Sequence, residues 1–355
     1  MFLAWNEIKN NKLRFTLIIG VLILVSYLVF FLSGLANGLE NMNKAAVDKW
    51  NSQGVILTKE SDINLPQSSL KLDDYNGEGA DEYASLAQIS SIATSGNNKS
   101  NVAIFGINKN EFIMPNVTEG EEFDKTGEVI ANDSLKNEGF ELGDELNLSS
   151  TEEKLTIVGF TKNAKFSASP VLYTDLDTVQ KIRYGEAADS YQDQINAFVI
   201  RTTDLSNVEV NENLQVVDTS TFIENLPGYS EQNLTLTLMI YFLFVISALV
   251  LAIFLYVLTI QKVSIFGVMK AQGISSKYLA GSVIAQTFLL SIAGVIIGFI
   301  LTIITGLFLP EAVPVDFNYL DLIIYGVVLI FVSILGALFS VQTIVKVDPL
   351  KAIGG

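Results

Sequence analysis

The side chains in this sequence that could carry out chemistry are mostly carboxylates. Glu152 and Glu153 are adjacent, and four more acids lie in the run 119–124. Paired carboxylates serve as general acid and base only where a fold holds them at a defined separation. We interpret both groups as solvated charges in loops, so the sequence predicts no acid–base site.

The composition excludes most other catalytic chemistry. The 355 residues contain no Cys and no His, which removes disulfides, thiolate nucleophiles, the Ser-His-Asp triad and the usual zinc sites. The phosphate-binding pattern G-x-x-x-x-G-K-[ST] is absent, so any ATP must be bound by another subunit. The net charge of −16 excludes a nucleic-acid binder with a basic footprint. We predict a protein that is not an enzyme and has no intrinsic cofactor or metal.

The charge is divided unevenly along the chain. Residues 38–233 hold 14 Lys and Arg against 33 Asp and Glu, a net of −19, whereas the rest holds 8 against 5. Four apolar runs outside this acidic block are long enough to cross a bilayer, which takes about 20 residues. They cover residues 15–39, 234–260, 279–309 and 319–345.

Basic residues next to the spans predict the orientation, because cytoplasmic loops are enriched in Lys and Arg. Lys9, Lys12 and Arg14 precede the first span, and Lys262, Lys270 and Lys277 lie between the second and the third. Lys346 and Lys351 follow the fourth. Both termini are therefore predicted to be cytoplasmic and the acidic block to face outward. A cleaved signal peptide is the alternative for the first span. However, the apolar run of this span is longer than the apolar region of signal peptides.

The predicted domain boundaries follow from these spans. Between the spans we expect an amphipathic elbow at 1–14, an outer domain at 40–233, a cytoplasmic coupling loop at 261–278, a short outer loop at 310–318 and a tail at 346–355. The elbow is predicted as an in-plane helix with Trp5 at the interface, with a disordered start as the alternative. Alternating β-rich runs and short helical patterns predict a mixed α+β outer domain.

The order of these parts, together with three motifs, resembles the FtsX/MacB-type (type VII) ABC-transporter permeases. The opening LAWNEIKNNKLR resembles the family's N-terminal elbow, QKVSIFGVMKAQGISSKYL its coupling segment, and VKVDPLKAIGG its D-P-x-x-A ending. Within the family, the chain is most similar to haem-exporter permeases (HrtB-like). The resemblance implies an α-helical membrane protein with four transmembrane helices and one large extracytoplasmic α+β domain, MacB core-like, inserted between helices 1 and 2.

The resemblance also implies partners and a mechanism. It implies a homodimer in a bacterial cytoplasmic membrane, two copies of a cytoplasmic ABC ATPase subunit, and second helices that act as levers on the outer domains. The predicted ATPase-coupling residues are Ile265, Phe266, Gly267, Val268, Met269, Lys270 and Gly273. The apolar surface of this segment would consist of Ile265, Phe266, Val268 and Met269, interrupted by Gly267. Gly273 would end the helix. A membrane-surface helix is the alternative.

The cargo implied by the narrower resemblance is haem, a flat and largely apolar molecule. Without His or Cys, its iron could be ligated only by Tyr, Met, Glu or Asp. The candidate substrate-binding residues are Trp50, Phe166, Tyr229, Tyr27, Phe31, Glu40, Met42 and Glu231. Interface or core packing is the alternative for each aromatic residue. Peptide, lipid or lipoprotein export and FtsX-like control of a cell-wall hydrolase remain alternative functions.

Overall fold

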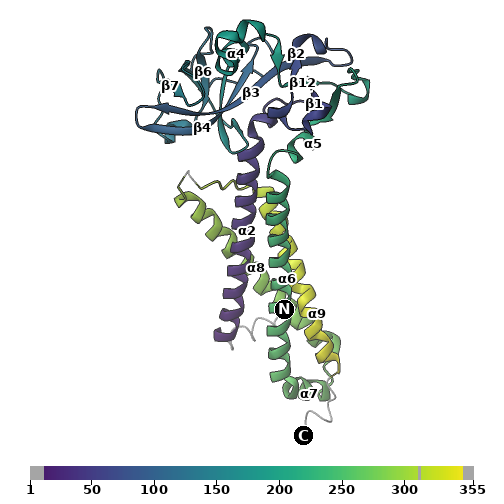
Figure 1. The fold of residues 1–355 in the computed structure, drawn as a ribbon. Coiled ribbons are helices and arrows are strands. Elements are labelled where there is room, and N and C mark those ends of the chain that lie inside the picture. The colour runs from purple at the N-terminus through teal and green to yellow at the C-terminus, as the bar shows by residue number, and fades with distance from the viewer. Residues whose placement is uncertain (1–11, 311–312, 347–355) are drawn as a thin grey trace. The chain divides into compact units, whose positions relative to one another are not determined.

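The computed structural model describes residues 12–310 and 313–346 (Figure 1). Most of the predicted elbow 1–14 and of the tail 346–355, and two residues of the outer loop 310–318, lie outside the described residues. Contacts divide the chain into two compact units. The membrane unit comprises residues 1–38 and 233–355, and the outer unit comprises residues 39–232.

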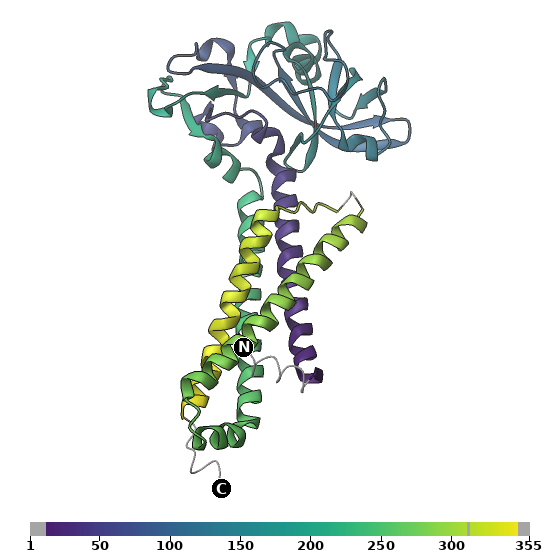
Figure 2. The same ribbon diagram turned by 180° about the vertical axis from the view of Figure 1, so that it is seen from behind.

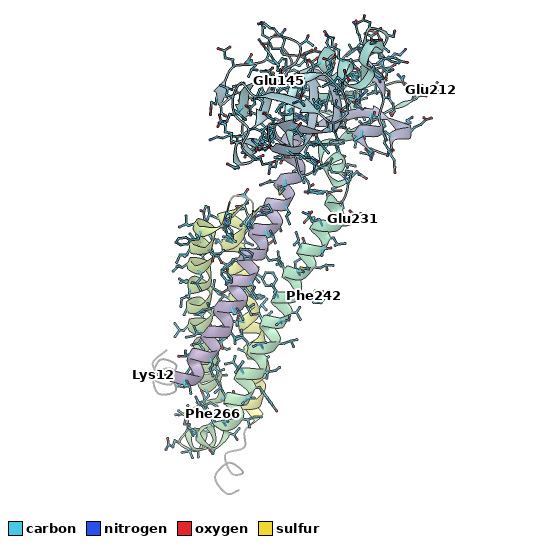
Figure 3. All side chains as sticks on the ribbon, turned by 60° about the vertical axis from the view of Figure 1, so that its left-hand side comes forward. Lys12, Glu145, Glu212, Glu231, Phe242 and Phe266 are labelled. Carbon is cyan, nitrogen blue, oxygen red and sulfur yellow. The ribbon has the colours of Figure 1, made fainter. Side chains whose placement is uncertain are left out.

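The membrane unit is built from four long helices and one short helix among the described residues. The long helices are α2 (Lys12–Asp48), α6 (Tyr229–Gln261), α8 (Ser276–Phe308) and α9 (Tyr319–Lys346), and the short one is α7 (Val263–Ala271). Each long helix contains a segment long and apolar enough to span a membrane. Many of their exposed side chains are Leu, Ile, Val and Phe, such as Phe242 at 64% exposure (Figure 3). Apolar side chains that face outward suit contact with lipid.

Helix α8 crosses α2 obliquely, and glycines permit the crossing (Figure 2). A Cβ on Gly294 would lie 2.5 Å from the Cβ of Leu22, and one on Gly298 would lie 2.1 Å from Ser26 Oγ. Ser26 Oγ also lies within hydrogen-bond distance, 3.1 Å, of the Gly294 carbonyl. These two glycines therefore serve a contact between helices of one chain, and a homodimer would need other residues for its interface.

The loop before α9 fills a second glycine-lined space in the membrane unit. A Cβ on Gly34 would lie 2.4 Å from the Phe317 ring, and one on Gly306 would lie 2.5 Å from it. The backbone N–H of Asp316 donates to the Gly34 carbonyl at 2.9 Å. Phe317 thus separates α2 from α8 at this level, whereas the two helices touch closely at Gly294 and Gly298.

The outer unit contains thirteen strands and three short helices within residues 39–232, all of which are described. The strands are β1 (Gly54–Thr58), β2 (Leu70–Lys71), β3 (Glu82–Ser95), β4 (Asn98–Ile107), β5 (Glu119–Gly120), β6 (Glu128–Asn132), β7 (Glu145–Leu148), β8 (Lys154–Thr161), β9 (Lys165–Phe166), β10 (Ser169–Asp175), β11 (Gln194–Ile195), β12 (Ala197–Arg201) and β13 (Leu214–Asp218). The helices are α3 (Ser134–Asn137), α4 (Leu176–Tyr184) and α5 (Thr219–Glu224).

Eleven of the strands form one mixed sheet in the order β13-β1-β12-β3-β4-β10-β6-β8-β5, with β7 and β9 joined beside this path. The pairs β10–β4 and β6–β8 are parallel, and the others in the sheet are antiparallel. Alternate residues of the central strands enter two separate cores. In β4, for example, Phe105 joins the core that contains the end of α2 and α5, and Ile104 joins the core beneath α4. Successive residues of a strand point to opposite faces of the sheet. Because both faces are buried, the central strands are strongly apolar.

Candidate functional site

Helix α7, in the loop between the second and third membrane helices, is a well-defined short helix. Gly273 follows its end with φ +90°, a backbone conformation that favours glycine. The Ile274 N–H donates to the Met269 carbonyl and the Gly273 N–H to the Lys270 carbonyl, both at 3.0 Å. These two bonds form a Schellman motif. Gly273 therefore closes the helix, as the sequence predicts.

The two faces of α7 have different environments. Phe266 is 3% exposed and packs with Leu279 and Val283 of α8, and Met269 packs against the same cluster (Figure 3). Ile265 and Val268 are 55% and 44% exposed. The predicted four-residue apolar surface is therefore reduced to these two side chains, because Phe266 and Met269 hold α7 on α8.

Two further predicted coupling residues lie within the same helix. The helix continues without a break through Gly267, which is buried, so this residue lies on the inner face and does not interrupt the exposed one. Lys270 lies in the last turn of α7 and is partly buried. A small buried residue beside Phe266 allows the inner face of α7 to lie close to its neighbours.

Three of the candidate cargo-binding residues lie in the core of the outer unit. Trp50, Phe166 and Tyr229 are 1%, 4% and 7% exposed and belong to one buried cluster. The Trp50 ring lies 6.2 Å from those of Phe105 and Phe222, and Phe105 lies 5.2 Å from Phe166. The structure brings these three residues together as packing partners, and a cargo could reach them only if this core opened.

The indole N–H of Trp50 is an unusual feature of this cluster. It is buried and has no hydrogen-bond partner within the described chain. An unpaired buried donor costs about 1–3 kcal/mol. The dispersion and burial energy of the large ring must therefore compensate for it.

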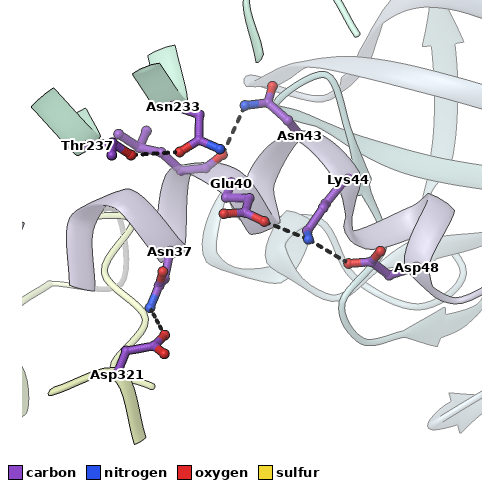
Figure 4. A network of polar contacts seen from close by, with 9 residues as sticks. Asn37, Glu40, Asn43, Lys44, Asp48, Asn233, Thr237 and Asp321 are labelled. Carbon is purple, nitrogen blue, oxygen red and sulfur yellow. Dashed lines mark hydrogen bonds and ion pairs between the residues drawn. The ribbon is translucent and has the colours of Figure 1, made fainter. Parts of the chain in front are cut away.

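The acidic and sulfur-containing candidates, Glu40, Met42 and Glu231, lie near the end of α2 and at the start of α6. Glu40 pairs with Lys44 at 2.6 Å, and Lys44 reaches Asp48 at 3.7 Å (Figure 4). The backbone carbonyl of Met42 accepts a hydrogen bond from the Ala168 N–H at 3.0 Å. Glu231 lies in the exposed first turn of α6. The carboxylate of Glu40 is thus already paired in this structure.

The remaining two candidates, Tyr27 and Phe31, lie in the membrane unit. Their rings stack with centroids 6.0 Å apart and an interplanar angle of 20°. The Tyr27 hydroxyl lies 3.2 Å from Thr305 Oγ1 of α8. Both rings are partly exposed. They form an aromatic face on α2 that is independent of the outer-unit core.

The structure adds two residues of the membrane unit that the sequence does not single out. Thr305 is the hydroxyl partner of Tyr27, and Phe317 fills the space between Gly34 and Gly306. Phe317 has a detectable signal, since it is an aromatic residue in a short loop between two predicted spans. Thr305 has none, because threonine is common in membrane helices.

The described residues contain no group of three or more acidic side chains placed to hold a metal ion. The features that remain are a helix with an exposed apolar edge, a glycine-packed helix bundle and an acidic outer unit.

Comparison with protein families identifies the class. The model described as FtsX-like permease C-terminal matches residues 237–349, and that of the MacB-like periplasmic core domain matches residues 15–215. The chain belongs to the FtsX/MacB-type ABC-transporter permeases, a family whose subunits work with an ATPase partner in a membrane. The predicted fold class is confirmed, with the α+β domain between the first and second of four membrane helices.

Individual relatives match over the whole chain. A putative hemin transport system permease protein HrtB from Staphylococcus epidermidis is 30% identical over 363 residues, covering 100% of this chain and 99% of that protein. The protein of the same name from Staphylococcus haemolyticus is 28% identical over 359 residues, with the same coverage. The crystallised periplasmic region of MacB from Actinobacillus actinomycetemcomitans is 16% identical, with a TM-score of 0.36 over 49% of this chain and 93% of that one.

Proposed function

We propose that this protein is the permease subunit of an ABC efflux transporter that exports haem from the membrane. The observation that carries the proposal is the full-length similarity to two permeases named for hemin transport. In this proposal the permease forms a homodimer in a bacterial cytoplasmic membrane. Both termini are cytoplasmic, and two copies of a separate ATPase subunit bind and hydrolyse ATP.

The exposed edge of α7 is the proposed contact with the ATPase. Ile265 and Val268 point away from the cluster that holds α7 on α8. Apolar side chains on a short helix fit a groove on a partner, which removes them from water. ATP-driven closure of the two ATPase subunits would push on α7 and, through Phe266, on α8.

The proposed cargo contact is the aromatic face of Tyr27 and Phe31. Stacked rings that are partly exposed offer a flat apolar surface to a flat cargo. The Tyr27 hydroxyl would be a weak oxygen ligand for the haem iron, and weak ligation suits a cargo that must be released. Trp50, Phe166 and Tyr229 would take part only in a state where the outer-unit core has opened.

Regulation of a cell-wall hydrolase is the competing function. A protein that recruits such an enzyme would need an exposed apolar docking patch on its outer domain. Within residues 39–232, the large apolar side chains that are exposed are Tyr83, Leu142 and Tyr191. Tyr83 lies on β3, whereas Leu142 lies between α3 and β7 and Tyr191 between α4 and β11. This distribution favours the transporter, and export of a peptide or lipid remains the alternative cargo class.

Replacement of Gly267 by proline tests the proposal in cells. Proline inside α7 removes a helical hydrogen bond and clashes with the preceding turn. Cells that lack the native protein should become sensitive to hemin and accumulate it, and native protein should restore tolerance only together with its ATPase subunit. The Gly267→Pro protein should reach the membrane but fail to restore tolerance.

Ser276→Pro is the matched control in the same loop. Ser276 is the first residue of α8, where proline is tolerated, and Ser275 before it is already extended at φ −67° and ψ 144°. This variant should restore hemin tolerance. Full rescue by Gly267→Pro would contradict the role of α7, and no change in hemin tolerance on loss of the protein would contradict haem as the cargo.

A further inference from the structure

Within the membrane unit, helices α2 and α8 touch closely at one level and separate further along both helices (Figure 2). At the close contact, a Cβ on Gly298 of α8 would overlap Ser26 of α2. At Gly34 of α2 and Gly306 of α8, the nearest atoms to an added Cβ belong instead to side chains of the segment before α9. This segment therefore lies between the two helices at the second level.

The ring of Phe317 fills the space between the two helices at this level. Its Cδ1 and Cε1 atoms are the nearest neighbours of a Cβ built on Gly34, and its Cδ2 and Cε2 atoms are those of a Cβ built on Gly306. The two edges of one ring therefore face opposite helices. Glycine is unfavourable inside a helix, but here any larger residue would overlap the ring.

The backbone of the segment that carries Phe317 is fixed to α2. The Asp316 N–H donates to the Gly34 carbonyl at 2.9 Å. A carbonyl oxygen has two lone pairs, so Gly34 can accept this bond although it lies inside a helix. Four residues further along α2, a Cβ on Gly38 would overlap the carbonyl group of Pro314. Both glycines thus allow the segment to lie directly against the helix.

Helix α9 holds the other end of the same segment. Asn318 Oδ1 accepts a hydrogen bond from the Leu320 N–H at 3.1 Å, as an N-cap residue does. Asn37 Nδ2 of α2 lies 3.4 Å from Asp321 Oδ2 in the first turn of α9 (Figure 4). The residues on both sides of Phe317 are therefore held in place, and the position of its ring is defined from both directions.

The aromatic face of Tyr27 and Phe31 lies between the close contact and the Phe317 ring. Tyr27, Phe31 and Gly34 follow one another at intervals of four and three residues, which places them on one face of α2. Thr305, whose Oγ1 lies 3.2 Å from the Tyr27 hydroxyl, directly precedes the α8 glycine that Phe317 contacts. The space between the helices beside the two rings is thus bounded by a close contact at one end and by Phe317 at the other.

We propose that Phe317 is a wedge that holds α2 and α8 apart beside Tyr27 and Phe31, and that it thereby keeps this space wide enough for a flat cargo. Glycine allows membrane helices to approach closely, so without the ring the helices would close the space, as they do at Gly298. Phe317 is therefore a positioning residue. The part of the proposal that concerns the cargo rests on the proposed function, whereas the spacing of the helices does not.

Distance measurements test the wedge without reference to a cargo. The chain has no Cys, so spin labels can be attached at Leu35 and Leu307, which directly follow Gly34 and Gly306. The full-length permease is assembled with its ATPase in nanodiscs and diluted with unlabelled copies. Phe317→Ala should shorten the distance between the labels by about 2 Å, the range over which side-chain size changes the distance between packed helices. An unchanged or longer distance would overturn the wedge.

Phe244→Ala is the matched control. Phe244 of α6 and Phe317 are both partly buried against the same apolar cluster, so either variant removes a ring and should lower the melting temperature. Only Phe317→Ala should change the Leu35–Leu307 distance, and Phe317→Leu, which keeps a bulky side chain, should shorten it less. Equal shortening in the Phe244→Ala and Phe317→Ala proteins, or in the Leu and Ala variants of Phe317, would overturn the wedge.

Hemin binding tests the consequence for the cargo. In absorbance titrations of the same nanodiscs, corrected for empty nanodiscs, Phe317→Ala should raise the Kd of hemin by about 2- to 10-fold, as expected for the loss of one aromatic contact. Phe244→Ala should leave the Kd unchanged. A shorter label distance with an unchanged Kd would overturn the role of Phe317 in cargo binding. Failure of the native protein to bind hemin would reject haem as the cargo, and the label distances would still decide for or against the wedge.

Discussion

Replacing Ile265 and Val268 together with serine should weaken binding of the ATPase subunit and leave the permease folded. The two side chains form the exposed edge of α7, at 55% and 44% exposure. Full burial of such a side chain contributes about 1.5–3 kcal/mol. Scaled by the exposed fractions, the pair accounts for roughly 2 kcal/mol of binding energy, or about a 30-fold change in Kd.

The assay is equilibrium binding of the purified ATPase subunit to the permease in nanodiscs. Leu307→Ser is the matched control, because Leu307 is a 78% exposed side chain near the other end of α8. It should leave the Kd unchanged. Phe266→Ala should instead lower the free energy of unfolding, by about 3–5 kcal/mol, because that ring is buried against α8.

An unchanged Kd for the Ile265 and Val268 double variant would refute the assignment of this edge to the ATPase. A weaker complex caused by unfolding would be accompanied by a lower melting temperature. Only a weaker complex with an unchanged melting temperature supports the reasoning.

Three other variants follow from the outer unit. Ala168→Gly should raise the free energy of unfolding by about 1 kcal/mol, because φ +64° costs alanine but not glycine; a lower melting temperature would contradict this. Hydrogen bonds from the Ser220 and Thr221 hydroxyls lower the pKa of Asp218 to about 2, from an ordinary 3.8. The Asp218 carboxylate therefore stabilises the fold above about pH 4, and this stabilisation is lost as the pH falls toward 2. The Asp218→Asn protein should have a lower free energy of unfolding at pH 7. In denaturation measured from pH 2 to 5, it should lack the acid-dependent loss of stability that Asp218 causes. Trp50→Ala should destabilise the outer unit by about 3–5 kcal/mol, and a fully stable variant with weakened hemin binding would instead place the cargo at this residue.

Much of the architecture can be predicted because it depends on the hydropathy and charge of long continuous segments. A bilayer requires long apolar helices, so the spans and the acidic block are visible as runs of composition. The α+β character of residues 40–233 is visible from alternating apolar residues, which the strands bury on both faces of the sheet. The ends of the helices are harder to predict from the sequence. Helix α2 continues to Asp48 through a polar stretch, whereas hydropathy alone would place its end earlier.

The sites are harder to predict because they depend on which elements meet. A helix as short as α7 presents apolar residues all round, and only its contact with α8 decides that Phe266 turns inward and Ile265 outward. Trp50 is near a predicted span in the sequence, which suggests an interface, but its ring enters the core of the outer unit.

The helix-packing glycines show the same limit. The spacing of Gly294 and Gly298 predicts close helix approach. It cannot specify that Leu22 and Ser26 of the same chain are their neighbours. That pairing depends on how α8 crosses α2, which no local pattern in the sequence encodes.

Haem export is tested by ATP-dependent release of hemin from membranes that contain this permease and its ATPase subunit as their only proteins. Proteoliposomes are loaded with hemin, and transfer to an external haem-binding protein is followed by absorbance, with a hydrolysis-deficient ATPase as the control. We expect transfer to be faster with ATP than in the control, and hemin to stimulate ATP hydrolysis. Active, cargo-independent ATP hydrolysis with no increase in hemin transfer would contradict haem export by this protein.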